Sequence, residues 1–416
     1  MATAADRRAY RGPKLFSYGF RPFFLAAAIW AALAVPLWLL SFTGYLPWAA
    51  LTREWHIHEM LFGVLAGIVA GFLLTAVPNW TGRLPVMGAP LAALSGLWLA
   101  GRLAMLAANE LGVWAAVIDS AFLVVFAGVI WREVLAARNW RNLAVCALVT
   151  VLACANIAFH LGGLAPEAVG QRAALGAVSM LIALIGGRVT PSFTRNWLTQ
   201  HAPGPLPAPA DRADTAALIL TGLAAVTWMA APETALAGAL LIAAGLAALA
   251  RLARWQGLRT LAEPLVWILH LGYAWLGVGL VLTGLTILAP DMAPRTAGVH
   301  ALTAGAVGVM TLAMMTRATR GHSGRPRVAD GWTLAIYLLV NAAAVVRVSA
   351  GFGGAHATVL LAVSGGLWSA AFGGFALAYG GMLLGWPARP RGRALPSYLK
   401  SRRGASSVIP RAGLAP

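Results

Sequence analysis

The chain has 416 residues, of which 60% are hydrophobic and only 11% are charged, and its mean hydropathy is +0.75. A soluble globular domain carries roughly a quarter charged residues, so this composition excludes a large water-soluble domain and indicates a polytopic membrane protein. The net charge of +18 would suit nucleic acid, but the basic residues lie in short segments between apolar runs, which is typical of membrane proteins, so we expect the lipid bilayer as partner and no nucleic acid.

Apolar runs long enough to cross a bilayer as helices recur about twelve times. They predict an all-α transmembrane domain over residues 22–387, between a basic N-terminal tail (1–21) and a basic C-terminal tail (388–416) that we expect to be disordered. A Pro/Ala-rich stretch over residues 190–214 is typical of a flexible linker. The predicted spans are 22–42, 58–78, 88–107, 111–131, 142–163, 171–190, 214–231, 235–250, 264–289, 297–317, 331–350 and 356–386.

The lysines and arginines predict the orientation of these spans. If the N-terminus is placed in the cytoplasm, the inner segments hold 26 of the 31 lysines and arginines and the outer loops hold 5. Cytoplasmic loops carry such an excess of basic residues. We therefore expect both termini and the 190–214 linker to be cytoplasmic.

A weak sequence repeat recurs at every fourth span. His58, Gln171 and His300 occupy equivalent positions in the second, sixth and tenth spans, and each is followed five residues later by a glycine. The segments GAVSMLIALIGGRVT and GAVGVMTLAMMTRAT also align without gaps. This pattern favours three parallel repeats of four helices, with chance similarity among Ala/Gly-rich helices as the alternative.

Histidines gather at the outer ends of the predicted helices. The second span opens with His56, His58 and Glu59, and His160 and His300 lie at the outer ends of the fifth and tenth spans. Ionisable groups inside a membrane are costly and commonly functional. Imidazole suits iron, copper and zinc, while the near absence of carboxylates at these ends disfavours hard ions such as calcium.

Residue spacing constrains how these side chains can share a metal. His56 and His58 point about 200° apart on an ideal helix, so one metal cannot take both unless His56 precedes the helix. Glu59 could orient an imidazole by accepting its second N–H, and Asn156 shares a helix face with His160. A haem iron between two facing histidines and a copper held by imidazoles both fit this pattern.

His270 lies apart from the others in the predicted topology. It falls in the inner half of the ninth span, within VWILHLGYAWLG, whereas His300 lies in the outer half of the tenth. At 1.5 Å per residue the two histidines are separated by about 20 Å along the membrane normal. His270 is therefore either a structural histidine or part of a second, inner site.

Several segments resemble the NnrS family of bacterial membrane proteins, and the resemblance spans nearly the whole chain. The matching segments are FSYGFRPFFL, WHIHEMLFGVLAGIVAGFLLTAVPNWTGRLP, ILHLGYAWLG and MMTRATRGHSGRP. The resemblance implies a protein of the bacterial inner membrane that contains haem and copper and is linked to nitric oxide metabolism, denitrification and nitrosative stress. It makes His56, His58, His160 and His300 the candidate haem ligands.

A weaker resemblance is to the catalytic subunit of haem–copper oxidases, which also has twelve helices arranged in three four-helix arcs. That subunit holds a low-spin haem by histidines of its second and tenth helices, where His56 and His300 would lie here. The sixth span offers Gln171 in place of a histidine, so the oxidase copper site cannot be carried over. The copper candidates are then His58, His160 and His270, and the scarcity of acidic residues and lysines in the spans disfavours proton pumping.

Three functions are compatible with these features. The first is a haem or haem–copper redox protein that acts on nitric oxide or a metal–nitrosyl species and takes electrons from an unidentified donor. The second is a sensor or assembly factor that binds haem without catalysis. The third is a twelve-helix transporter, which the parallel repeat disfavours because transporters typically have inverted repeats.

Overall fold

The computed structural model describes residues 10–162 and 164–386. Across this described part of the chain the regular structure is helical, without strands, and twelve helices are long and apolar enough to cross a membrane. The predicted all-α fold of about twelve spans is therefore confirmed. A compact unit runs to Gly385. The C-terminal tail predicted for 388–416, and residues 1–9 of the N-terminal tail, lie outside the described residues.

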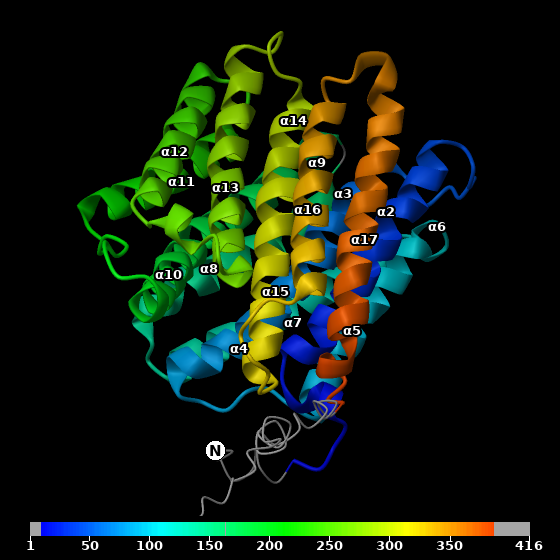
Figure 1. The fold of residues 1–416 in the computed structure, drawn as a ribbon. Helices are drawn as coiled ribbons and strands as arrows, with labels where there is room; N and C mark the ends of the chain where they lie inside the picture. Colours follow the sequence, from blue (N-terminus) through cyan, green and yellow to red (C-terminus); the bar gives the residue numbers. More distant parts are fainter. Residues whose placement is uncertain (1–9, 163, 387–416) are drawn as a thin grey trace, which may run out of the picture. The chain divides into compact units, whose positions relative to one another are not determined.

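The helices, labelled in Figure 1, follow the apolar runs closely. Short helices lie at Lys14–Ser17 (η1), Ala108–Leu111 (α6) and Gly257–Thr260 (η5). The spans are formed by α2 (Phe20–Phe42); α3, η2 and α4 (Arg53–His58, Glu59–Leu65, Ala66–Thr81); α5 (Ala89–Leu106); α7 (Val113–Ala136); η3 and α8 (Trp140–Asn142, Leu143–Leu161); α9, η4 and α10 (Leu164–Leu181, Ile182–Gly186, Gly187–His201); α11 (Arg212–Ala230); α12 (Ala235–Ala253); α13 (Pro264–Leu288); α14, η6 and α15 (Arg295–His300, Ala301–Val307, Gly308–His322); α16 (Gly331–Ala350); and η7 and α17 (Gly354–His356, Ala357–Leu383).

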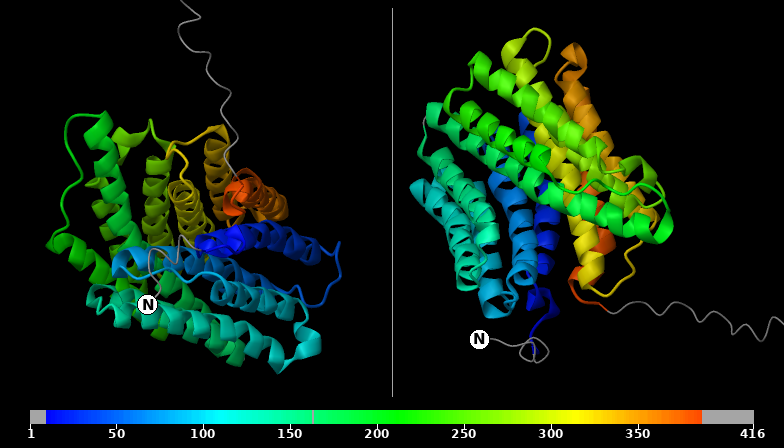
Figure 2. Two further views of the ribbon diagram at one scale, coloured as in Figure 1. Left: turned by 90° about the horizontal axis from the view of Figure 1, so that it is seen from below. Right: turned by 90° about the vertical axis from the view of Figure 1, so that its left-hand side faces the viewer.

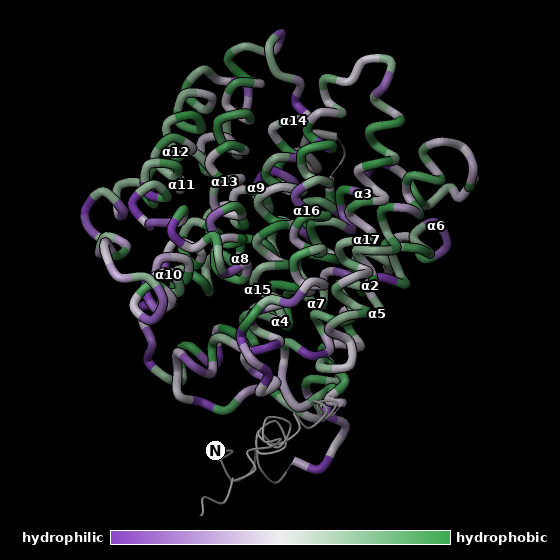
Figure 3. The backbone as a smooth tube through the Cα atoms, in the orientation of Figure 1, coloured by the Kyte–Doolittle hydropathy of each residue, from purple (hydrophilic) through white to green (hydrophobic). Residues whose placement is uncertain are grey.

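The second, sixth and tenth spans form the centre of the bundle. In the most apolar 18-residue stretch of each of these spans, 83%, 67% and 67% of the stretch is buried, compared with 44% in the first span. Figure 2 shows the helices of the first part of the chain, blue to cyan, grouped on one side of the bundle. Hydrophobic residues run along most of the helices and hydrophilic ones gather in the connections (Figure 3).

The first and last spans lie side by side and close the bundle. The indole N–H of Trp368 in α17 donates to the carbonyl of Ala31 in α2 at 3.1 Å, and the guanidinium of Arg21 donates to the carbonyl of Met382 at 2.7 Å. The start of the first span and the end of the last therefore lie at the same end of the bundle, as Figure 1 shows. An even number of spans requires this arrangement.

The flexible linker predicted for residues 190–214 is in large part ordered helix. Helix α10 continues through Pro191 to His201, and the non-helical stretch is 202–211. The guanidinium of Arg259 donates hydrogen bonds to three carbonyls of this stretch. The prediction rested on the Pro/Ala-rich composition of the stretch, but membrane helices tolerate proline where neighbouring groups satisfy the freed carbonyl.

Each of the three central spans contains one π-helical segment. Segment η2 begins one residue after His58 and η6 begins one residue after His300, but η4 begins eleven residues after Gln171. The second and tenth spans therefore share this feature at the same register, and the sixth does not. The arrangement as three four-helix repeats is not confirmed.

Candidate metal centre

Two histidines and an aspartate from three different spans meet at one point, which we call the His–Asp–His cluster. His58 Nε2, at the end of α3, lies 2.9 Å from Asp119 Oδ2 in α7 and 3.2 Å from His160 Nε2 in α8. His160 Nε2 is also 2.9 Å from that aspartate oxygen. Ligand atoms that share one first-row metal at about 2.0–2.2 Å lie about 2.8–3.6 Å apart for angles of about 90–109°. The cluster has this spacing.

A second set of buried side chains holds the cluster in place. His58 Nδ1 is 3.1 Å from Glu59 Oε1. Arg102 of α5 donates to both oxygens of Glu59, at 2.7 and 2.8 Å, and also to Asp119 Oδ1. The indole N–H of Trp30 donates to Glu59 Oε2 at 2.5 Å. Arg102 is 1% exposed and Glu59 0%, so one buried guanidinium fixes two buried carboxylates.

The absence of a side chain at Gly63 lets α5 approach this closely. A Cβ at position 63 would lie 2.5 Å from Arg102 Nη1 and 2.7 Å from Glu59 Oε2. The indole N–H of Trp98, one turn before Arg102 on α5, donates to the carbonyl of Gly63 at 3.0 Å. A side chain at position 63 would therefore displace the ion pair from its present geometry.

The electrostatics of the cluster favour a bound cation. A carboxylate has no proton to donate, so the Nδ1 of His58 that faces Glu59 carries the hydrogen. The Nε2 of a neutral His58 then presents a lone pair to Asp119 Oδ2, and this contact is attractive only with a proton or a metal between the two atoms. Glu59, Asp119 and Arg102 together carry one uncompensated negative charge, which either cation would offset.

The remaining contacts orient the aspartate and exclude water. Asn156 Nδ2 donates to Asp119 Oδ2 at 2.9 Å, and its Oδ1 is 3.2 Å from His58 Nε2. The rings of Phe62 and Phe159 lie 5.3 and 5.5 Å from the imidazole of His58. The cluster is thus polar at its centre and has aromatic side chains against it.

His56 and His300 belong to a different neighbourhood, near the N-terminal ends of the second and tenth spans, which the predicted orientation makes the outer ends. The ring of His56 stacks on Trp38, with centroids 4.1 Å apart, and its buried Nδ1 has no hydrogen-bond partner. His300 Nδ1 donates to the carbonyl of Thr296 at 2.7 Å, which leaves Nε2 as the lone-pair nitrogen. The two histidines interact electrostatically with each other and with Arg347. We call this group the outer histidine pair.

His270 joins neither group. Its Nε2 is 2.8 Å from the hydroxyl of Thr194, and that hydroxyl donates its own proton to the carbonyl of Thr190. His270 is therefore the donor, and its Nδ1, buried against Gly257, has no hydrogen-bond partner. The structure brings His58 and His160 together but does not place His270 with them.

Two residues of the centre were not identified from the sequence. Asp119 and Arg102 are each 1% exposed, whereas the count of basic residues places Arg102 among the five of the outer loops. The view that carboxylates are nearly absent at these helix ends is wrong, because Glu59 and Asp119 both point into the cluster. The sequence does contain a signal for Asp119 and Arg102. Each is the single charged residue within an apolar run, VWAAVIDSAFLVV for Asp119 and SGLWLAGRLAML for Arg102, and such residues are functional candidates by default.

The fold and the cluster define a class, namely an all-helical polytopic membrane protein with a buried group of two histidines and an aspartate at metal-ligand spacing. The family described as NnrS protein matches residues 14–386, so the chain belongs to the NnrS family and the resemblance of its motifs is confirmed. No curated protein matches the chain. Membership is consistent with a membrane protein related to nitric oxide, in a family broadly associated with metal and haem.

Proposed function

We propose that this protein binds haem and copper in the bacterial inner membrane and acts in nitric oxide metabolism, with copper held by His58, Asp119 and His160. The observation that carries the proposal is the convergence of three potential ligand atoms at metal-ligand spacing inside the membrane domain. Two imidazoles and a carboxylate form a donor set that suits copper or iron. A bound copper ion would supply one-electron redox chemistry.

The protein's own residues prepare this site. Glu59 accepts the Nδ1 proton of His58 and so directs Nε2 toward the cluster, as a carboxylate does for a metal-bound histidine. Arg102 fixes both carboxylates, and Asn156 holds the oxygen of Asp119 that faces the histidines. These contacts set the direction of the His58 and Asp119 donors before any cation binds.

The outer histidine pair would supply two imidazoles to a haem iron. Haem iron is commonly held by imidazoles, and His56 and His300 come from the two spans that carry low-spin haem ligands in the oxidases. His300 donates its Nδ1 proton to a backbone carbonyl, as ligating histidines usually do. Arg347 has no ion-pair partner among the described residues, and its charge suits the carboxylates of a haem.

The test is haem and metal content in purified variants. His58→Ala and Asp119→Asn should lose copper and keep the haem absorption band, whereas His56→Ala and His300→Ala should lose the haem band and keep copper. His356→Ala, which changes an exposed histidine outside both groups, should keep both. Full copper in a correctly folded His58→Ala variant would refute the assignment of the cluster.

Turnover separates the redox protein from the non-catalytic alternatives. The purified, metal-replete protein with a chemical reductant should consume nitric oxide faster than the His58→Ala variant. Equal and negligible rates in both would favour a sensor or assembly factor. A preparation that contains neither haem nor copper under replete conditions would favour a transporter.

A further inference from the structure

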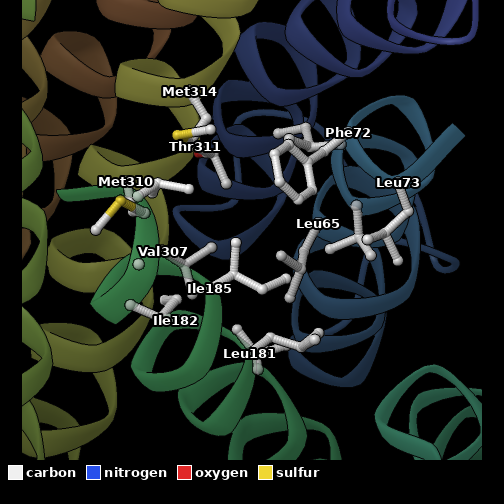
Figure 4. Close-up of a pocket in the computed structure, with 15 residues that line it drawn as sticks. Leu65, Phe72, Leu73, Leu181, Ile182, Ile185, Val307, Met310, Thr311 and Met314 are labelled. Carbon is white, nitrogen blue, oxygen red and sulfur yellow. The ribbon is translucent and has the colours of Figure 1, made fainter. Parts of the chain in front are cut away.

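An apolar cavity lies near the middle of the three central spans, away from both histidine groups (Figure 4). It comprises about 630 Å³ of non-atom space, part of it open to the surroundings. Leu65, Ile185 and Val307 extend toward it from the second, sixth and tenth spans. Its walls are hydrophobic side chains and glycine, apart from the hydroxyl of Thr311.

The chemistry of the walls limits what can occupy this space. No lining residue carries a charge, an imidazole or an amide, so an ion or a strongly polar ligand would lose its hydration without compensation. Water is also disfavoured, because a water molecule needs two to four polar partners and apolar cavities stay dry. A haem held by histidine is excluded as well, because no histidine lines the cavity.

The backbone around the cavity distinguishes it from a packing defect. Leu65 ends η2, Val307 ends η6, and Ile182, Ile185 and Gly186 belong to η4. Each π-helical segment in the part of the chain that the structure describes therefore contributes to the cavity wall. π-Helical turns are rare and frequently mark functional sites, and here three of them from distant parts of the sequence reach one space.

One of these segments links the cavity to the His–Asp–His cluster. Segment η2 begins with Glu59, which contacts His58, and ends with Leu65 at the cavity. The seven-residue separation of His58 and Leu65 corresponds to about 10 Å along a helix axis. The cavity therefore lies deeper in the membrane than the cluster, by about the length of η2.

We propose that this cavity binds small uncharged apolar gas molecules, nitric oxide being the one that matters here, and supplies them to the His–Asp–His cluster. The proposal rests on the function proposed above. Such molecules need no hydrogen-bond partner, enter from the hydrocarbon core of the bilayer and gain dispersion contacts with the aliphatic walls. The cavity thus raises the local concentration of gas about 10 Å from the metal site.

Xenon is the direct probe, since apolar cavities bind it. Anomalous diffraction from crystals of the full-length protein under xenon pressure should show xenon beside Ile185 and Val307. Ile185→Trp should abolish that site, and Leu377→Trp, an equally large change at a residue 88% exposed on α17, should retain it. The smaller change Gly186→Ala, whose Cβ would make only ordinary contacts at 3.4 Å or more, should reduce occupancy without straining the fold.

Stopped-flow binding of nitric oxide then tests delivery. Ile185→Trp should bind nitric oxide more slowly than Leu377→Trp, at unchanged metal content. Absence of xenon in the wild-type protein, or a lipid chain in its place, would overturn the cavity proposal, and an unchanged rate in Ile185→Trp would overturn delivery. Xenon binding with no reaction of nitric oxide at the metal would instead refute the proposed function, so the two failures are distinguishable.

Discussion

Gly63→Ala is the smallest change that tests whether the ion pair behind the His–Asp–His cluster supports metal binding. The added Cβ would lie 2.5 Å from Arg102 Nη1 and 2.7 Å from Glu59 Oε2, closer than the 3.0 Å that real Cβ contacts respect. The guanidinium must therefore retreat by at least 0.5 Å from a position where it donates to both Glu59 oxygens at 2.7 and 2.8 Å. Both groups are buried, so neither can move into solvent.

The expected losses of stability and of metal affinity follow from the contacts that the added methyl group displaces. Overpacking a buried site costs about 1–3 kcal/mol, and a helical Gly→Ala change returns about 1 kcal/mol, so a folded variant with modestly lower stability is expected. Loss of the contact between Glu59 and His58 should lower metal affinity by about 10–100-fold, as removal of a partner that orients a ligand typically does. The affinity loss should therefore exceed the stability loss.

The assay measures how much copper the purified protein retains in competition with a chelator of known affinity. The thermal midpoint of unfolding is measured on the same samples to report stability. Gly96→Ala is the matched control, since it lies on α5, the helix of Arg102, and its Cβ would meet nothing within 4 Å. Its copper affinity should equal that of the wild-type protein. Wild-type copper affinity in a folded Gly63→Ala variant would refute the view that Glu59 and Arg102 position His58.

Three further predictions follow from other regions. A reporter fused within residues 202–211 should be active in the cytosol, because most basic residues lie on that side; a periplasmic signal would reverse the proposed orientation. His270→Ala should keep both haem and copper by metal analysis, because its ring bonds to Thr194 outside both histidine groups; loss of either would assign His270 to a metal site. The hydrogen bond from Arg254 holds the pKa of Asp211 below its ordinary value. The pair therefore stabilises the fold above pH 4, and this contribution is lost as the pH falls through the lowered pKa of Asp211. The difference in Tm between wild-type and Asp211→Asn protein should shrink in acid, and a pH-independent difference would contradict this.

The sequence predicted the spans well because apolar run length maps directly onto membrane thickness. The opposite directions of His56 and His58 likewise follow from helix geometry alone, and the structure has one on Trp38 and the other in the cluster. These are local properties, which depend on a single helix and its solvent. They can therefore be derived without knowing which helices are neighbours.

The composition of the metal centre could not be derived in that way. Asp119 pairs with His58 across 61 positions of the chain, so its role depends on how α7 packs against the second span. The π-helical segments were also missed, because a hydrophobic pattern read at a period of 3.6 gives no sign of a local change in backbone hydrogen bonding. The count of basic residues places Arg102 in a loop, because a guanidinium is expected to contact water unless a buried carboxylate partner is known.

The two sites proposed here would be completed at different moments of protein synthesis. His58, Asp119 and His160 all lie within the first five spans, which end at Leu161. The walls of the apolar cavity include the tenth span, and closure of α17 on α2 needs the last. At roughly 5–20 residues per second the ribosome takes roughly 10–45 s to add the residues between Leu161 and Leu383. A nascent chain can therefore present all three residues of the His–Asp–His cluster before the remaining spans have been synthesised. The copper proposed for the cluster would have that interval in which to bind, before α17 packs against α2.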